Sequence, residues 1–213
     1  MDRFTKLREA TAASVVEVER GEKPRLLGTL ANLYFGFNPG EYAHERREQL
    51  GFAVGDELAA AAERGFVALL LGQPLPLLSD LARMNAASEY HPHWYAILAG
   101  MDLYWEQERT VPSHAMEAVF ALSLLLSTWD EAGSLAPASR REWSCFIYSQ
   151  HPAIAERVYE ALLLELIGAG ADALGLLRRL KESPAAAWRG VLAGRLQSPD
   201  PDTAAMLEEL ARG

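Results

Sequence analysis

Apolar residues recur along this chain at intervals of three and four residues, which is the spacing of one face of an α-helix. A clear example inside the segment 152–168 is the row formed by Ile154, Val158, Leu162 and Leu166. The alternation of apolar and polar residues that is typical of a half-buried strand does not occur. The pattern therefore predicts an all-α protein.

The periodic segments predict a series of helices, with ends accurate to about 2 to 4 residues. The helices cover residues 2–18, 25–36, 41–50, 54–71, 76–87, 92–108, 112–127, 139–149, 152–168, 171–181, 184–197 and 202–211. The short connections predict that consecutive helices are antiparallel neighbours. This order suits either an irregular stacked helix-turn-helix array, similar to an α-solenoid, or a globular helical bundle.

Several of these helices are predicted to begin where a residue that can cap a helix precedes a proline, because the first turn tolerates proline. The pairs are Asn38–Pro39, His91–Pro92, His151–Pro152, Ser183–Pro184 and Asp200–Pro201. Asn38 and Ser139 are each followed three residues later by a glutamate, which predicts two capping boxes.

The segment 112–127 is apolar on nearly all sides. A helix of this kind is covered on several sides by its neighbours, so we place it at the centre of the fold. The stretch 129–139 is rich in Gly, Ser, Ala and Pro, and is either a long loop or a boundary between two halves. We treat residues 1–213 as a single all-α unit with a candidate sub-boundary near 129–139.

The chain is acidic, with 20 basic against 29 acidic side chains and a formal net charge of −9, which disfavours binding to nucleic acid and anionic lipid. The amino terminus is charged where a secretory signal is apolar. The most apolar run, 66–71, is far shorter than the ~20 residues of a membrane span. The single cysteine, Cys145, excludes an internal disulfide, and its neighbours Trp143 and Phe146 predict a buried, inert thiol. We therefore expect a cytoplasmic protein.

The densest group of aromatic and polar residues lies between residues 89 and 106. Trp94, Met101 and Trp105 share one stripe of the predicted helix, because eleven residues span about three turns. Such a stripe suits the core, and where part of it is exposed it suits a partner-binding face. Asp102 and Glu106 lie one turn apart on another face, where solvation explains them better than acid–base chemistry. The predicted partner-binding residues are Tyr90, Trp94, Tyr95, Asp102, Trp105 and Glu106.

The same segment offers an alternative site for a transition metal, formed by His91, His93 and Glu89, with His114 or His44 completing the shell. The favoured interpretation is structural: His91 caps the helix and His93 lies in its first turn. No Gly-X-Ser-X-Gly elbow and no phosphate-binding or dinucleotide-binding motif occurs in the sequence. We therefore predict a non-enzymatic protein without cofactor or metal.

From about residue 90 to the end, the order of several short segments carries a family resemblance. The segments are 93–101, 104–105, 143–152, 176–180, 183–190 and 200–202. Their succession resembles the HEAT-like helical repeat region that accompanies NACHT-type NTPase modules in large bacterial proteins. In that family the ATPase module hydrolyses nucleotide, and the helical array senses a trigger or holds the protein inactive. The resemblance implies a scaffold or sensor region, and it transfers no functional residue to this chain.

These observations support three hypotheses. The favoured one is a helical interaction or sensor module that binds a protein partner or a neighbouring domain. The second is a small metal-dependent helical enzyme or sensor that uses His91, His93 and Glu89. The third is a homodimeric helical regulator in which the apolar stripe closes the dimer interface.

Overall fold

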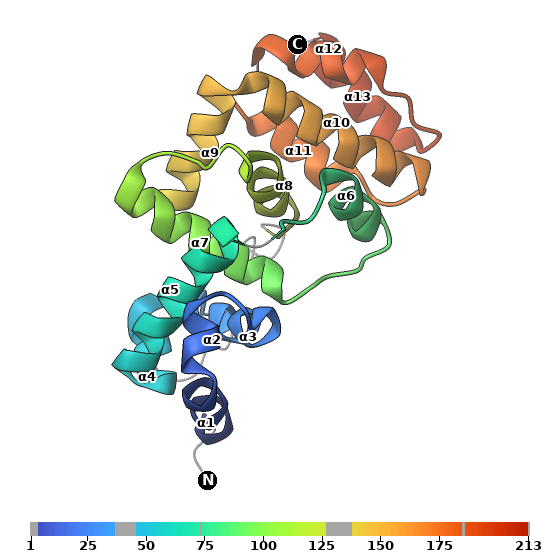
Figure 1. The fold of residues 1–213 in the computed structure, drawn as a ribbon. Coiled ribbons are helices and arrows are strands. Elements are labelled where there is room, and N and C mark those ends of the chain that lie inside the picture. The colour runs from blue at the N-terminus through green and yellow to red at the C-terminus, as the bar shows by residue number, and fades with distance from the viewer. Residues whose placement is uncertain (1–3, 37–45, 73, 127–137, 185, 213) are drawn as a thin grey trace. The chain divides into compact units, whose positions relative to one another are not determined.

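The computed structural model describes residues 4–36, 46–72, 74–126, 138–184 and 186–212, which are mostly helical (Figure 1). The helices are α1 (Thr5–Ala13), α2 (Val15–Glu19), α3 (Pro24–Tyr34), α4 (Arg46–Val54), α5 (Asp56–Gly72), α6 (Leu78–Ala86), α7 (His93–Glu108), α8 (Met116–Leu126), α9 (Ala138–Gln150), α10 (Pro152–Gly168), α11 (Leu174–Glu182), α12 (Ala186–Arg195) and α13 (Pro201–Arg212). No strand occurs among the described residues, and none of their helices is long and apolar enough to cross a membrane. The all-α prediction is confirmed.

The chain forms two compact units, each assembled from separate stretches of sequence. Unit 1 comprises Met1–Leu75, His91–Ala115 and Asp130–Arg140, and unit 2 comprises Pro76–Tyr90, Met116–Trp129 and Arg141–Gly213. Because the chain passes repeatedly from one unit to the other, no single cut in the sequence separates them. The sub-boundary expected near 129–139 falls mostly within 127–137, outside the described residues, and the treatment of 1–213 as a single unit stays a prediction.

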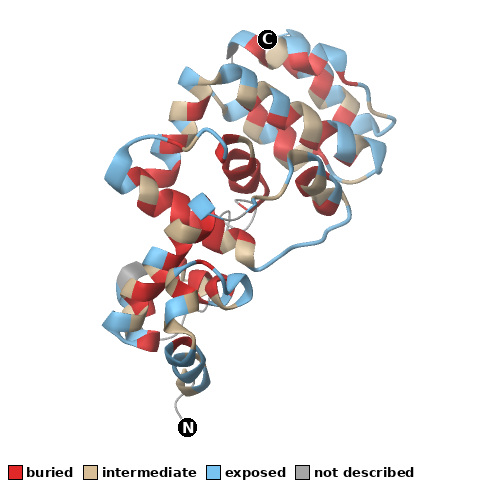
Figure 2. Cartoon of the chain, viewed as in Figure 1, coloured by how far each residue is buried: buried red, intermediate tan, exposed pale blue. Residues whose placement is uncertain are grey.

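In unit 1, α7 packs against α3 and α5, and α5 also packs against α2 and α4. Figure 2 shows in red the buried residues that these helices contribute. The fully buried side chains of this core include Leu27, Leu30, Phe66, Leu70 and Leu98. Burial of apolar surface of this kind is the main favourable contribution to folding, so unit 1 has a hydrophobic core of its own.

Two glycines let the helices of unit 1 approach until their backbones touch. A Cβ atom on Gly65 of α5 would lie 2.1 Å from the carbonyl oxygen of Val18, and a Cβ atom on Gly100 of α7 would lie 2.2 Å from that of Phe66. Ordinary van der Waals contact begins at 3.4 Å. Any larger residue at either position would therefore push the helices apart.

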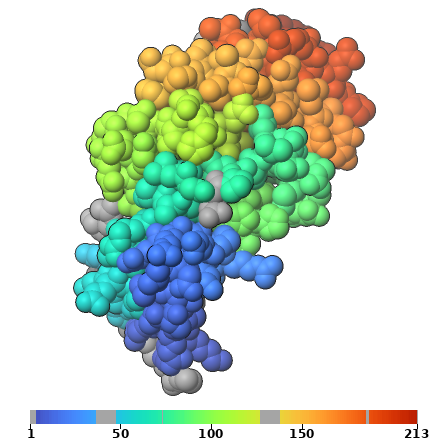
Figure 3. Space-filling view, in the orientation of Figure 1, coloured from blue at the N-terminus to red at the C-terminus, as the bar shows by residue number. Residues whose placement is uncertain are grey.

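In unit 2, α8 is the most deeply buried helix: every residue of Met116–Leu126 except Glu117 is buried. It packs against α6 and α10, and α10 also contacts α12. The expectation that this segment is covered on several sides is confirmed, and its place is within unit 2. The pair α12 and α13, at the red end of the colour scale in Figure 3, packs side by side.

Proline marks the first residue of α10 and α13, as predicted for Pro152 and Pro201. Asp200 caps α13, because its Oδ2 accepts a hydrogen bond of 2.8 Å from the Thr203 backbone N–H. This hydrogen bond lowers the pKa of the exposed Asp200 carboxyl group. A local sequence signal is sufficient at this helix start because the cap and the group it satisfies are only three residues apart.

The capping box predicted at Ser139 is wrong. Helix α9 begins at Ala138, before Ser139, and the buried Ser139 Oγ has no hydrogen-bond partner within the described part of the chain. The box predicted at Asn38 lies outside the described residues. Helices α7 and α12 begin one and two residues after Pro92 and Pro184, respectively, which is within the expected error of the helix ends.

Two further expectations about the helices need correction. The helix predicted at 2–18 is interrupted at Ser14, whose non-helical backbone separates α1 from α2. Consecutive helices are neighbours in α1–α2, α3–α4, α4–α5 and α12–α13, whereas α7 packs on α3 and α10 packs on α6. Apolar faces therefore select partners across long sequence separations, a choice that connection lengths alone do not reveal.

Candidate functional site

The structure buries half of the predicted partner-binding residues. Trp94, Trp105 and Asp102 are 1 %, 7 % and 0 % exposed, respectively, in unit 1. These three side chains therefore belong to the core and do not form the exposed face that the sequence suggested. Tyr95 is partly buried, with its ring 6.4 Å from that of Phe35.

The other two residues of the predicted set are exposed. Glu106 lies in the last turns of α7 in unit 1. Tyr90 is 44 % exposed and is the last residue of a stretch that belongs to unit 2. Of the predicted set, Glu106 is thus the exposed residue in unit 1.

Asp102 forms a buried ion pair, so the expectation that this carboxylate is solvated is wrong. Its Oδ2 accepts a hydrogen bond of 3.0 Å from Nη2 of Arg140, and the two side chains are 0 % and 10 % exposed. The Arg140 guanidinium also lies 4.8 Å from the centre of the Phe35 ring, within the range of a cation–π interaction. This cluster ties the start of α9 to unit 1 and leaves Asp102 no access to a substrate.

The histidines at the start of α7 are stacked on each other. The centres of the His91 and His93 rings are 5.3 Å apart and the rings are inclined by 23°, while the centres of the His91 and Trp94 rings are 5.8 Å apart in a T-shaped arrangement. Burial lowers the pKa of His93, and the nearby His91 lowers it further. His93 is therefore neutral at pH 7. The side-chain cap expected from His91 is absent, since Pro92 holds the N-cap position without a side-chain hydrogen bond.

The residues of the proposed metal site do not gather into one. Glu89 belongs to unit 2 and His91 and His93 to unit 1, while His114 Nε2 lies 3.2 Å from the Leu70 carbonyl oxygen. Across the described ranges, no three His, Cys, Asp or Glu side chains lie close enough to hold one ion. His44 lies outside these ranges.

Cys145 is exposed on α9 of unit 2, so the expectation of a buried thiol is wrong. The flanking Trp143 is fully buried, because residues two apart on a helix face different directions. Phe146, on the other side, is only partly buried. The two aromatic neighbours therefore do not cover the thiol.

A buried aromatic cluster occupies the inside of unit 2. The hydroxyl groups of Tyr148 and Tyr159 are hydrogen-bonded at 2.8 Å, and Phe120 and Trp188 pack around them. Burial raises the pKa of Tyr148 to about 12 and that of Tyr159 well above its usual value. Both hydroxyl groups are therefore protonated at neutral pH. Each satisfies the other, which explains how the core accommodates them.

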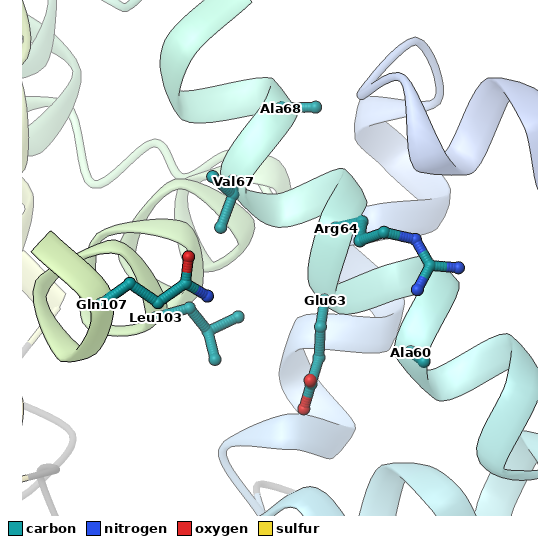
Figure 4. A pocket seen from close by; sticks show the side chains of 7 residues that line it. All are labelled: Ala60, Glu63, Arg64, Val67, Ala68, Leu103 and Gln107. Carbon is teal, nitrogen blue, oxygen red and sulfur yellow. The ribbon is translucent and has the colours of Figure 1, made fainter.

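An open groove runs between α5 and α7 of unit 1, with a volume of about 380 Å³. Helix α5 contributes Ala60, Glu63, Arg64, Val67 and Ala68, and helix α7 contributes Leu103 and Gln107 (Figure 4). We call it the α5–α7 groove. Its floor is apolar and its rim is polar or charged, which is the composition of many recognition surfaces.

The side chains that line the α5–α7 groove point in different directions. Figure 4 shows Val67 and Leu103 projecting into the space between the two helices, whereas Arg64 points away from α7. Arg64 is held there by an ion pair of 2.6 Å with Glu19. The opening to the groove is therefore bordered by Glu63 and Gln107.

Sequence reasoning did not identify the α5–α7 groove. A signal was present in the alanines of α5, at 59–62 and 68, because small side chains leave space beside a helix. Their meaning depended on the identity of the neighbouring helix. The pairing of α5 with α7 is a tertiary contact between segments that α6 separates in the chain.

No protein-family model, curated protein or solved structure matches this chain. The resemblance to the helical region beside NACHT-type NTPases stays a prediction.

Proposed function

We propose that this chain is a non-enzymatic helical interaction module, whose α5–α7 groove binds a short amphipathic segment of a protein partner. The observation that carries the proposal is the combination of an apolar floor, formed by Val67 and Leu103, with a polar rim at Glu63 and Gln107. A helical segment that places apolar side chains into such a groove is a common mode of peptide recognition.

The walls of the groove are two helices that pack closely against each other. The contact of Gly100 with the Phe66 carbonyl group sets the separation of α5 and α7. Leu103 is only 2 % exposed, so the floor is anchored in the core of unit 1. A preformed site avoids much of the entropy cost that ordering a loop would impose.

Charge defines the kind of segment that fits. The rim carries the Glu63 carboxylate, and the only rim cation, Arg64, is paired with Glu19 among the described residues. Glu106 lies next to Gln107 in sequence and is exposed. The net charge of −9 favours a partner segment with lysine or arginine beside its apolar residues.

The proposal includes the cytoplasm as the place of action, supported by the use of one cysteine and by the acidic composition. A neighbouring domain of a larger protein is one possible source of the bound segment, as the resemblance to NACHT-associated arrays implies. The groove recognises the same chemistry in either case.

Filling the groove tests the proposal. Ala60 lines the groove, and Ala60→Trp places a large ring in it. The matched control is Ala12→Trp, on an exposed position of α1 in the same unit. Peptides selected from a displayed library of basic amphipathic helices on the wild-type chain should bind Ala12→Trp equally well and Ala60→Trp at least about tenfold more weakly, since one lost apolar anchor is worth ~1.4 kcal/mol or more.

Equal binding to Ala60→Trp and wild type, with both variants folded by circular dichroism, would remove the groove from the proposal. Failure to select any peptide would count against peptide recognition as a whole. Light scattering gives the molar mass in solution of the wild-type chain and of the Ala60→Trp variant. A dimer that forms in the wild type and is lost in the variant would show that the partner is a second copy of this chain.

A further inference from the structure

A second pocket in unit 1 lies beside His93 and is separate from the α5–α7 groove in its lining residues. Its volume is about 360 Å³, and its apolar wall includes Leu69, Leu75 and Ile97. Two polar side chains, Glu22 and His93, complete it. We call it the His93 pocket. A largely apolar cavity of this size with few polar groups is the usual composition of a small-molecule site.

Backbone contacts fix the walls of the His93 pocket. Gly21, on the turn between α2 and α3, has a φ of +77°, and a Cβ atom there would lie 2.7 Å from the Leu69 backbone nitrogen. A Cβ atom on Gly28 of α3 would lie 2.5 Å from the Pro92 carbonyl carbon, just before His93. The pocket is therefore held between segments that cannot separate or close without disturbing unit 1.

The two polar groups of the pocket have complementary properties. Glu22 is exposed, and its carboxylate has no ion pair or hydrogen bond with any described residue. His93 is half-buried and neutral at pH 7, so one ring nitrogen is a hydrogen-bond acceptor. None of the described residues that line the pocket is a lysine or an arginine.

We propose that the His93 pocket binds a small organic amine. The apolar body of the ligand contacts Leu69, Leu75 and Ile97, and its ammonium group lies at the carboxylate of Glu22 with His93 as a further acceptor. Ammonium donates three hydrogen bonds and accepts none, so it matches the carboxylate of Glu22 and the acceptor nitrogen of His93. A carboxylate ligand is disfavoured because the negative charge of Glu22 repels it.

The pocket offers one carboxylate, that of Glu22, among its described lining residues. The expected ligand therefore has a single ammonium group on a short hydrocarbon body.

Three probes of equal chain length test the proposal on the full chain: hexylamine, hexanol and hexanoate at pH 7.5. We expect hexylamine to shift the backbone amide resonances of Gly21, Leu75 and Ile97 in nitrogen–proton correlation spectra. Its Kd should be on the order of 1 mM, because a ligand of few heavy atoms gains limited affinity. Hexanol should bind about threefold more weakly, which is the size of effect expected for one partly exposed charge interaction, and hexanoate more weakly still.

Two glutamate-to-glutamine variants decide whether Glu22 is responsible for the preference for hexylamine over hexanol. Glu22→Gln should bind hexylamine and hexanol with equal affinity, and Glu9→Gln, an exposed position on α1, should keep the preference for hexylamine. The proposal is overturned if Glu22→Gln keeps that preference or if hexanoate binds as well as hexylamine. It is also overturned if the amide resonances that shift belong to residues away from the pocket, or if no probe binds with a Kd below about 20 mM, which corresponds to negligible affinity. We expect Ala60→Trp to leave this binding unchanged, because Ala60 lines the α5–α7 groove and not the His93 pocket. The result is therefore independent of the α5–α7 groove.

Discussion

Replacing Gly100 by alanine should destabilise unit 1, although alanine is the better helix former. The added Cβ atom would lie 2.2 Å from the carbonyl oxygen of Phe66 and 2.7 Å from its carbonyl carbon. Both are backbone atoms of α5, which cannot rotate away as a flexible side chain would. The variant therefore requires α5 and α7 to move apart.

The size of the movement gives the size of the effect. Increasing the 2.2 Å distance to the 3.4 Å of ordinary contact requires a local separation of 1.2 Å along that direction. A gap of 0.5–1 Å already removes a quarter to a half of the dispersion energy of the atoms that border it. Overpacking of this kind costs about 1–3 kcal/mol, while the helical preference of alanine over glycine returns about 1 kcal/mol. We expect a net loss of up to about 2 kcal/mol.

Urea unfolding followed by circular dichroism measures the change in stability, and hydrogen exchange locates it. Exchange should accelerate in peptides from α5 and α7. Gly175→Ala is the matched control, because a Cβ atom at Gly175 of α11 would have nothing within 4 Å. That variant should be as stable as the wild type or more stable, by up to about 1 kcal/mol. A Gly100→Ala protein at least as stable as Gly175→Ala would refute the reasoning from backbone contact.

Three further predictions concern buried or partly buried polar groups. Asp102→Ala leaves the guanidinium of Arg140 buried without its carboxylate and should cost about 3–5 kcal/mol in urea unfolding; a loss below about 1 kcal/mol would contradict a buried ion pair. Tyr148→Phe deprives the Tyr159 hydroxyl of its partner and should cost about 1–3 kcal/mol, more than the double replacement of both tyrosines by phenylalanine. Because the folded-state pKa of Tyr148 is about 12, against about 10 in the unfolded chain, its contribution to stability is present below pH 10 and is lost as the pH rises toward 12. The pKa of His93 is lowered in the folded state, so the unfolded chain takes up a proton first as the pH falls below about 6.5; Tm should decrease from pH 7.5 to 5.5, and His93→Gln should reduce that decrease.

Much of the helical structure was predictable because its causes are local. Asp200 and Pro201 mark the start of α13 within three residues of the groups they satisfy. The burial of α8 was likewise predictable from its apolar residues, because it does not depend on which helices cover it. Ser139 shows the limit of local signals: it has the spacing of a capping box, yet α9 starts before it.

The candidate site was less predictable because exposure is not a local property. Trp94 and Trp105 are equally compatible with a core or an interface, and their burial depends on α3 and α5 lying against α7. The same is true of Asp102, whose partner Arg140 is distant in sequence. The α5–α7 groove could not be identified until two separated helices were known to be neighbours.

Helical periodicity and capping act over a few residues, so the all-α class, the positions of most helices and the burial of α8 could be predicted from the amino-acid sequence. Tertiary structure decided which helices pair, which aromatic residues are buried, and where the α5–α7 groove and the His93 pocket lie. These features depend on contacts between residues far apart in the chain. At Gly100 the approach of α7 to the backbone of α5 decides whether a single methyl group is tolerated.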